Sequence, residues 1–137
     1  MRQQLNHIKS ELDHWPEMPA RHICSKIIDF VEENPISQLE MLSMRTLAHI
    51  SNENSIDRDL ISAILILSSS LNVIERRFLY FAADKKEYPL SEEDFNEAEK
   101  LGTIIDPSTG TEVELLENNI FIYYTISNKI RLLKNSA

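Results

Sequence analysis

The sequence predicts an α+β fold, with helices in the first half of the chain and mostly strands in the second. Apolar residues recur at helical spacing up to about residue 71. From Val73 onward, β-branched and aromatic residues gather in short runs separated by turn-prone sequences. The sequence shows no regular alternation of strands and helices, which favours a small antiparallel sheet over a parallel α/β sheet. A chain of 137 residues is long enough for one domain.

Four helical segments are expected before the first strand. The first, over residues 2–14, presents an apolar stripe at spacings of three and four: Leu5, Ile8, Leu12 and Trp15. The second begins at Ala20 and stops at Asn34, because Pro35 follows. The third is interrupted near Ser43 or Met44, and the fourth covers residues 57–71 with apolar residues around most of its circumference.

Strands and one further helix make up the rest of the prediction. Residues 73–83 are expected to form a strand that returns as a hairpin through Glu87 to Pro89. Ser91 is placed to cap a short helix that Gly102 ends in the left-handed conformation. The tail is expected to form three or four short antiparallel strands in the segments "TII", "TEVELL", "NIFIYYTIS" and "KIRLL". The intervening "DPSTG" indicates a tight turn, in which Asp106 caps and Gly110 takes positive φ.

The central block, from Thr46 to Tyr88, resembles a winged helix-turn-helix. Its short helix, the polar turn "SNENS", the apolar helix 57–71 and the hairpin follow one another in the order of that fold. We therefore expect an appended amphipathic helix over residues 1–16 and one α+β domain over 17–137. Within that domain, a winged-helix-like core would span about 20–90, and a helix with a β-strand tail would span 91–137.

If the resemblance implies DNA binding, the third helix and the wing would supply the contacts. The residues concerned are Arg58, Ser62, Ser69, Arg76, Arg77, Lys85 and Lys86. DNA-binding surfaces neutralise several phosphates, and this supply of cations is small. Winged helices also serve as protein-interaction modules, so DNA-binding transcriptional regulation is the alternative rather than the leading hypothesis.

The acidity of the chain is regional. Its formal net charge is −8, yet the segment from Glu87 to Glu117 alone holds ten carboxylates and one lysine. Such a segment repels nucleic acid and attracts basic protein surfaces. The carboxylates that we expect to contact a basic protein partner are Glu92, Glu93, Glu97 and Glu99. A solvated face that only maintains solubility is the simpler alternative.

The apolar stripe of residues 2–14, with Trp15, is the second candidate interaction surface. An appended amphipathic helix either packs on its own domain or pairs with a partner, often a second copy of the chain. Apolar stripes centred on tryptophan are typical of interface anchors. We therefore expect docking of a partner or a homodimer through this helix.

Several other functions have little support in the sequence. With only two glycines, Gly102 and Gly110, the chain has neither a phosphate-binding loop nor a dinucleotide-binding fingerprint. His7, Glu11 and His14 share one helical face and could ligate a metal, but solvent-exposed side chains are the simpler interpretation. We expect no catalytic residues, metal or cofactor. The single Cys24, the lack of an apolar leader and the short apolar runs predict a cytoplasmic protein that does not enter membranes.

The leading hypothesis is a non-enzymatic protein-interaction module, such as an adaptor, an immunity protein or an accessory subunit. It would act through the acidic face and the apolar helix.

Overall fold

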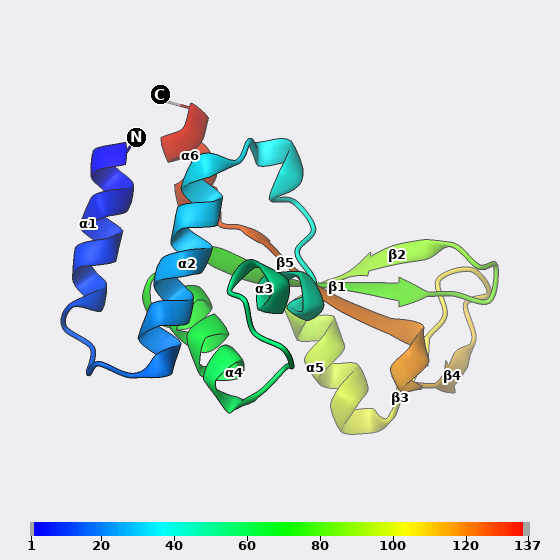
Figure 1. The fold of residues 1–137 in the computed structure, drawn as a ribbon. Coiled ribbons are helices and arrows are strands. Elements are labelled where there is room, and N and C mark those ends of the chain that lie inside the picture. Colours follow the sequence, from blue (N-terminus) through cyan, green and yellow to red (C-terminus); the bar gives the residue numbers. More distant parts are fainter. Residues whose placement is uncertain (1, 136–137) are drawn as a thin grey trace. The chain divides into compact units, whose positions relative to one another are not determined.

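A computed structural model describes residues 2–135 and confirms the α+β class. The described residues form six α-helices, a three-stranded antiparallel sheet and a two-stranded sheet (Figure 1). They divide into two compact units. Of the described residues, unit 1 contains 2–75 and 124–135, and unit 2 contains 76–123. This division differs from the expected one, since unit 2 begins inside the first strand and ends inside the last.

Unit 1 is mainly helical. Its elements are α1 (Arg2–Leu12), α2 (Pro19–Glu33), the 3-10 turn η1 (Ile36–Gln38), α3 (Met44–Ile50), α4 (Arg58–Leu65), the π-helical turn η2 (Ile66–Ser70) and α6 (Asn128–Asn135). Two polar side chains begin helices by accepting a backbone N–H three residues on: Ser43 caps α3 at 3.1 Å and Asp57 caps α4 at 3.0 Å. The interruption expected near Ser43 is thereby confirmed.

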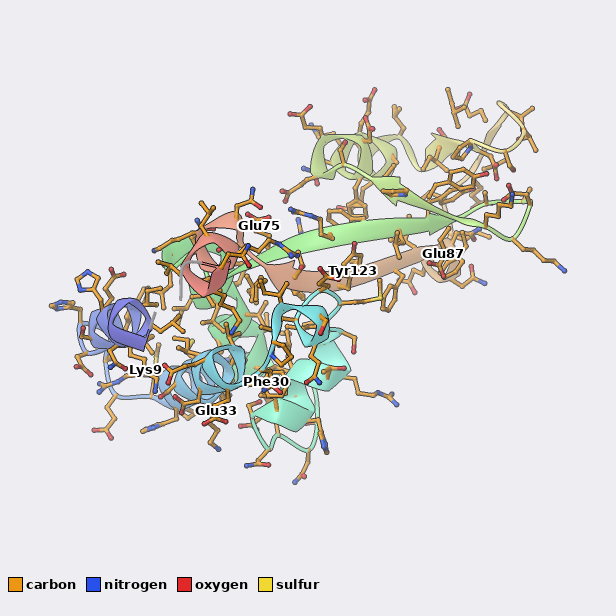
Figure 2. All side chains as sticks on the ribbon, turned by 90° about the horizontal axis from the view of Figure 1, so that it is seen from above. Lys9, Phe30, Glu33, Glu75, Glu87 and Tyr123 are labelled. Atoms are coloured by element: carbon orange, nitrogen blue, oxygen red, sulfur yellow. The ribbon has the colours of Figure 1, made fainter. Side chains whose placement is uncertain are left out.

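The core of unit 1 centres on α2, which packs against both α1 and α4. Leu5, Ile8 and Leu12 of α1 are 0–3% exposed and belong to the same cluster of buried side chains as Ile23 and Ile27 of α2. Lys9 of α1, labelled in Figure 2, forms an ion pair with Asp29 of α2. The helix over the first residues is therefore part of the unit 1 core and not an appendage.

The prediction of a strand at "KIRLL" is wrong, because these residues belong to α6. Ser127 Oγ accepts the N–H of Ile130 at 3.2 Å, which caps the helix. Ile130 is fully buried, Leu133 packs on the same core, and Lys134 Nζ donates to the carbonyl of Val31 in α2 at 2.8 Å. A spacing of three between Ile130 and Leu133 is helical, but five residues are too few for the pattern to distinguish a helix from a strand.

Unit 2 is built on a β-hairpin. Strand β1 (Ile74–Phe81) pairs with β2 (Glu87–Leu90), as expected, and β5 (Ile120–Ile126) completes the sheet in the order β2-β1-β5. Helix α5 (Glu92–Leu101) and the hairpin of β3 (Thr103–Ile105) with β4 (Glu112–Glu114) follow β2 in the chain (Figure 1). A 3-10 turn, η3 (Glu117–Asn119), leads back into β5. The strands expected at "TII", "TEVELL" and "NIFIYYTIS" are confirmed.

Candidate functional site

A pocket of about 410 Å³ lies within unit 2, between β2, α5 and β3. Its size falls in the range of ligand-binding pockets in proteins. Side chains from the strands, the helix and the turn after β3 contribute to it. The lining residues are Tyr80, Tyr88, Pro89, Leu90, Asp94, Glu97, Ala98, Leu101, Thr103, Ile104, Ile105, Pro107 and Glu112. All lie in unit 2, so the pocket belongs to one compact body.

Helix α5 forms one wall of the pocket. Ser91 Oγ accepts the N–H of Asp94 at 3.1 Å and begins the helix, and Gly102 ends it at φ 72°, as the sequence predicts. Asp94, Glu97 and Leu101 line the pocket from positions i, i+3 and i+7, which is one face of a helix. Phe95 and Ala98 of the same helix are buried, and Ala98 also lines the pocket.

The β1–β2 hairpin forms the opposite wall. Tyr80 and Tyr88 are cross-strand partners, so both rings project from the same face of the sheet. Phe78 lies on the same face of the sheet as Tyr80. Its ring stacks on Phe95 of α5, with the ring centroids 4.2 Å apart. Alternation along β1 therefore directs Phe78 and Tyr80 toward α5 and brings the two tyrosines to the pocket.

Both tyrosine hydroxyls are held by carboxylates. Tyr88 donates to Asp84 Oδ2 at 2.6 Å, and this hydrogen bond raises the pKa of Tyr88 and lowers that of Asp84. Tyr80 donates to Asp106 Oδ2 at 3.1 Å, and its pKa is raised, chiefly by burial and then by this contact. Neither ring can rotate away from the pocket without losing a charge-assisted hydrogen bond.

Asp106 fastens the "DPSTG" turn to the hairpin. Its Oδ1 accepts from Ser108 Oγ at 2.5 Å and Ser108 N–H at 2.8 Å, while Oδ2 accepts from Ala83 N–H at 2.9 Å as well as from Tyr80. The hydroxyl of Ser108 contributes most to lowering the pKa of Asp106 to about 2. Gly110 has φ 72°, as expected for this turn. Every contact of Asp106 is thus with its own turn or the hairpin, which is a structural role.

The structure separates the four predicted acidic contact residues. Glu97 lines the pocket, and Glu93 and Glu99 are exposed elsewhere on α5. Glu92 pairs with Arg76, whose Nη2 donates to Glu92 Oε1 at 2.8 Å. The set is therefore one pocket residue, two exposed carboxylates and one partner in an ion pair.

The apolar stripe of α1 is not available to a partner in this structure. Leu5, Ile8 and Leu12 are buried in the core of unit 1, and Trp15 is half-buried against the same core. The sequence left two alternatives for this helix, packing on its own domain or pairing with a partner. In the structure it packs on its own unit. We therefore do not carry forward docking or dimerisation through these residues.

The residues of the DNA-binding hypothesis are divided between the two units. Arg58, Ser62 and Ser69 belong to unit 1, and Arg76, Arg77, Lys85 and Lys86 belong to unit 2. Arg76 is engaged with Glu92, and its guanidinium lies 5.0 Å from the ring centroid of Phe78. The face of α4 that contains Arg58 also exposes Ile61 and Leu65, which are 44% and 58% exposed.

The histidines of residues 2–135 do not form a metal site. His7 Nε2 lies 3.8 Å from Glu11 Oε1, and both side chains are largely open to solvent. No group of three or more His, Cys, Asp or Glu side chains in the described part of the chain is placed to hold a metal ion. Cys24 is buried, and burial raises the pKa of its thiol to about 12, which makes it a poor nucleophile.

Sequence reasoning missed most of the pocket. Asp94, Leu101, Ile105 and Glu112 line it, and Leu101 and Ile105 are each 66% exposed. The i, i+3, i+7 spacing of Asp94, Glu97 and Leu101 was the available signal on α5. The contributions of β2 and β3 depend on tertiary structure and leave no pattern in the sequence.

No protein-family model matches the chain, and neither the curated proteins nor the solved structures compared with it give a match. Within residues 2–135, no helix combines the length and the apolar character needed to cross a membrane.

Proposed function

We propose that this chain is a non-enzymatic protein-interaction module that binds a basic partner through the acidic face of unit 2. The observation that carries the proposal is a concentration of charge on one body. Residues 76–123 contain eleven carboxylates and five Lys or Arg, whereas the rest of the chain contains eleven carboxylates and nine Lys or Arg. We expect the partner to meet it in the cytoplasm.

Two features of α5 and the adjoining β3 support this face as the contact surface. Glu93, Glu97 and Glu99 are all exposed within about two turns of one short helix. Beside them, Leu101 and Ile105 offer exposed apolar area of the kind found in the centres of protein interfaces. Charge would steer a basic partner to the face, and apolar burial would hold it there.

DNA binding is less well supported. A DNA-reading helix presents polar and cationic groups to base edges and phosphates, and α4 presents Ile61 and Leu65 beside Arg58. Arg76 is also already paired with Glu92. The winged-helix resemblance stays a prediction, supported by the order of α2, α3, α4 and the β1–β2 hairpin along the chain.

The test uses a fluorescein-labelled peptide of alternating lysine and leucine, with a glutamate–leucine peptide as the charge control. We expect the lysine peptide alone to bind, with an affinity that falls as salt is raised. Glu93→Gln with Glu99→Gln should weaken binding about three- to tenfold at low salt, the range expected for two exposed charges.

The matched control neutralises two carboxylates of unit 1, Glu33→Gln with Glu53→Gln, and so changes the net charge equally (Figure 2 shows Glu33 on α2). Equal weakening by both pairs would show that only net charge matters and would overturn the proposal. A duplex DNA probe in the same salt series tests the alternative. Steeply salt-dependent DNA binding that is lost in Arg76→Ala with Arg77→Ala would favour it instead.

A further inference from the structure

We propose that the pocket of unit 2 receives an arginine side chain of the basic partner. This inference rests on the proposed function and adds the anchor residue that the site would recognise. Three observations point to it: the charge on the rim, the apolar walls, and the half-buried ring of Tyr88, whose hydroxyl proton is already donated to Asp84.

The rim of the pocket favours a cation. Asp94 and Glu97 line it from α5, and Glu112 lines it from β4. No Lys, Arg or His stands among its lining residues as far as the structure describes the chain. A positive group entering here would meet three carboxylates at the edge of a partly apolar cavity, where charges interact more strongly than in bulk water.

The walls favour a long side chain with an aliphatic stem. Leu101 and Ile105 are each 66% exposed at the pocket, and Ile104 and Ala98 continue the apolar lining. Three methylenes of an arginine would cover this surface while its guanidinium remains at the rim. A guanidinium is also more weakly hydrated than an ammonium group, so bringing it against apolar walls costs less.

The tyrosines select for a planar cation. Because Tyr80 donates to Asp106 and Tyr88 donates to Asp84, their hydroxyl protons are not available to a ligand. Tyr80 is buried, so the half-buried ring of Tyr88 is the aromatic surface that a ligand meets. A guanidinium stacks on aromatic rings while it pairs with carboxylates. The walls are also preorganised, since the Ser91 cap fixes α5 and Asp106 fixes the turn after β3.

The experiment titrates the ¹⁵N-labelled chain with acetyl-Gly-Arg-Gly-amide and, in parallel, with the peptide that carries citrulline in place of arginine. Citrulline keeps the shape of arginine and removes its charge. We expect saturable shifts of the amides of Ala98, Leu101 and Ile104 with the arginine peptide, and about tenfold weaker binding of the citrulline peptide.

Two variants that each remove one carboxylate serve as a matched pair. Glu97→Gln lies in the pocket and should weaken binding of the arginine peptide about threefold or more, whereas Glu33→Gln removes an exposed carboxylate of unit 1 and should leave it nearly unchanged. Unaltered amide spectra of the free variants establish that both fold.

Equal binding of the two peptides, shifts that do not saturate, or equal effects of the two variants would each overturn the inference. The lysine–leucine peptide contains no arginine and reports on the acidic face alone. If that peptide binds and the arginine peptide does not, the anchor is wrong while the proposed function stands. If neither binds, both are overturned.

Discussion

The phenol of Tyr80 donates to Asp106 Oδ2 across 3.1 Å and so joins β1 to a turn that lies 26 residues further along the chain. Both residues are buried, at 2% exposure each. The carboxylate accepts three further hydrogen bonds, from Ser108 Oγ, Ser108 N–H and Ala83 N–H. Because these donors stabilise the ionised form, unit 2 depends on Asp106 keeping its charge.

Acid should therefore weaken unit 2 through this residue. The pKa of Asp106 is lowered from 3.8 to about 2, so the unfolded state takes up its proton first as the pH falls. The stabilisation is complete above about pH 4 and is lost as the pH approaches 2. Urea unfolding at several pH values should show a smaller loss over this interval in Asp106→Asn than in the parent chain. Glu114→Gln, which removes an exposed carboxylate on β4, is the control. If it reduced the acid-induced loss of stability as much as Asp106→Asn does, that loss could not be assigned to Asp106.

The ion pair of Arg76 and Glu92 should contribute little by itself. The two side chains are 40% and 60% exposed, and solvent screens pairs of this kind to about 0.2–1 kcal/mol. Arg76→Ala should nevertheless cost more than Glu92→Ala, because the guanidinium also covers the ring of Phe78. A double-mutant cycle on the free energy of unfolding separates the two effects. Equal costs for the two single variants would argue against a contribution from the ring.

Removing either serine N-cap should cost about 1 kcal/mol. Ser91 in unit 2 and Ser43 in unit 1 each accept a backbone N–H from the residue three positions later. The distance is 3.1 Å in both cases. Ser91→Ala and Ser43→Ala should therefore lower the free energy of unfolding by similar amounts, whereas Ser91→Asp should retain the cap. Thermal or urea unfolding followed by circular dichroism measures both. A Ser91→Asp variant as unstable as Ser91→Ala would show that the cap is not what the serine supplies.

The local devices of α5 were predictable because they act within one turn of chain: a serine before the helix, a glycine after it and an aromatic residue four positions in. The same reasoning placed Asp106 in its turn. The hydrogen bonds that Asp106 accepts from Tyr80 and Ala83 could not be predicted from the sequence, because folding must first bring the turn and the hairpin together. The pocket has the same origin, because Tyr88, Leu101 and Ile105 come from three separate elements.

The errors have physical causes too. A stripe such as Leu5, Ile8 and Leu12 looks alike whether it packs against its own chain or against another, because both require the same apolar helical face. Its burial on α2 decides between them here. The segment "KIRLL" is too short for its helical spacing to be told from a strand, and its helix depends on the cap at Ser127.

The core position of α1 leads to a prediction about stability. Leu12→Ala should lower the free energy of unfolding by about 2–5 kcal/mol, because Leu12 is 3% exposed within the unit 1 core. His14→Ala, at an exposed position two residues on, should have almost no effect. If instead Leu12→Ala changed the mass measured by light scattering and left the stability intact, the stripe would serve an interface after all.

Cys24 provides an independent reporter of that core. The thiol is fully buried and donates to the carbonyl of Ala63 at 3.4 Å, and burial raises its pKa to about 12. At pH 8 the buried thiol therefore stays protonated, and alkylation requires unit 1 to open. Iodoacetamide labelling followed by mass spectrometry should be slow in the native chain and fast in urea. Leu12→Ala should accelerate it roughly in proportion to the loss of stability, because a less stable core opens more often. Rapid labelling of the untreated chain would mean that Cys24 is accessible and that the packing of α1 and α2 described here is not the one in solution.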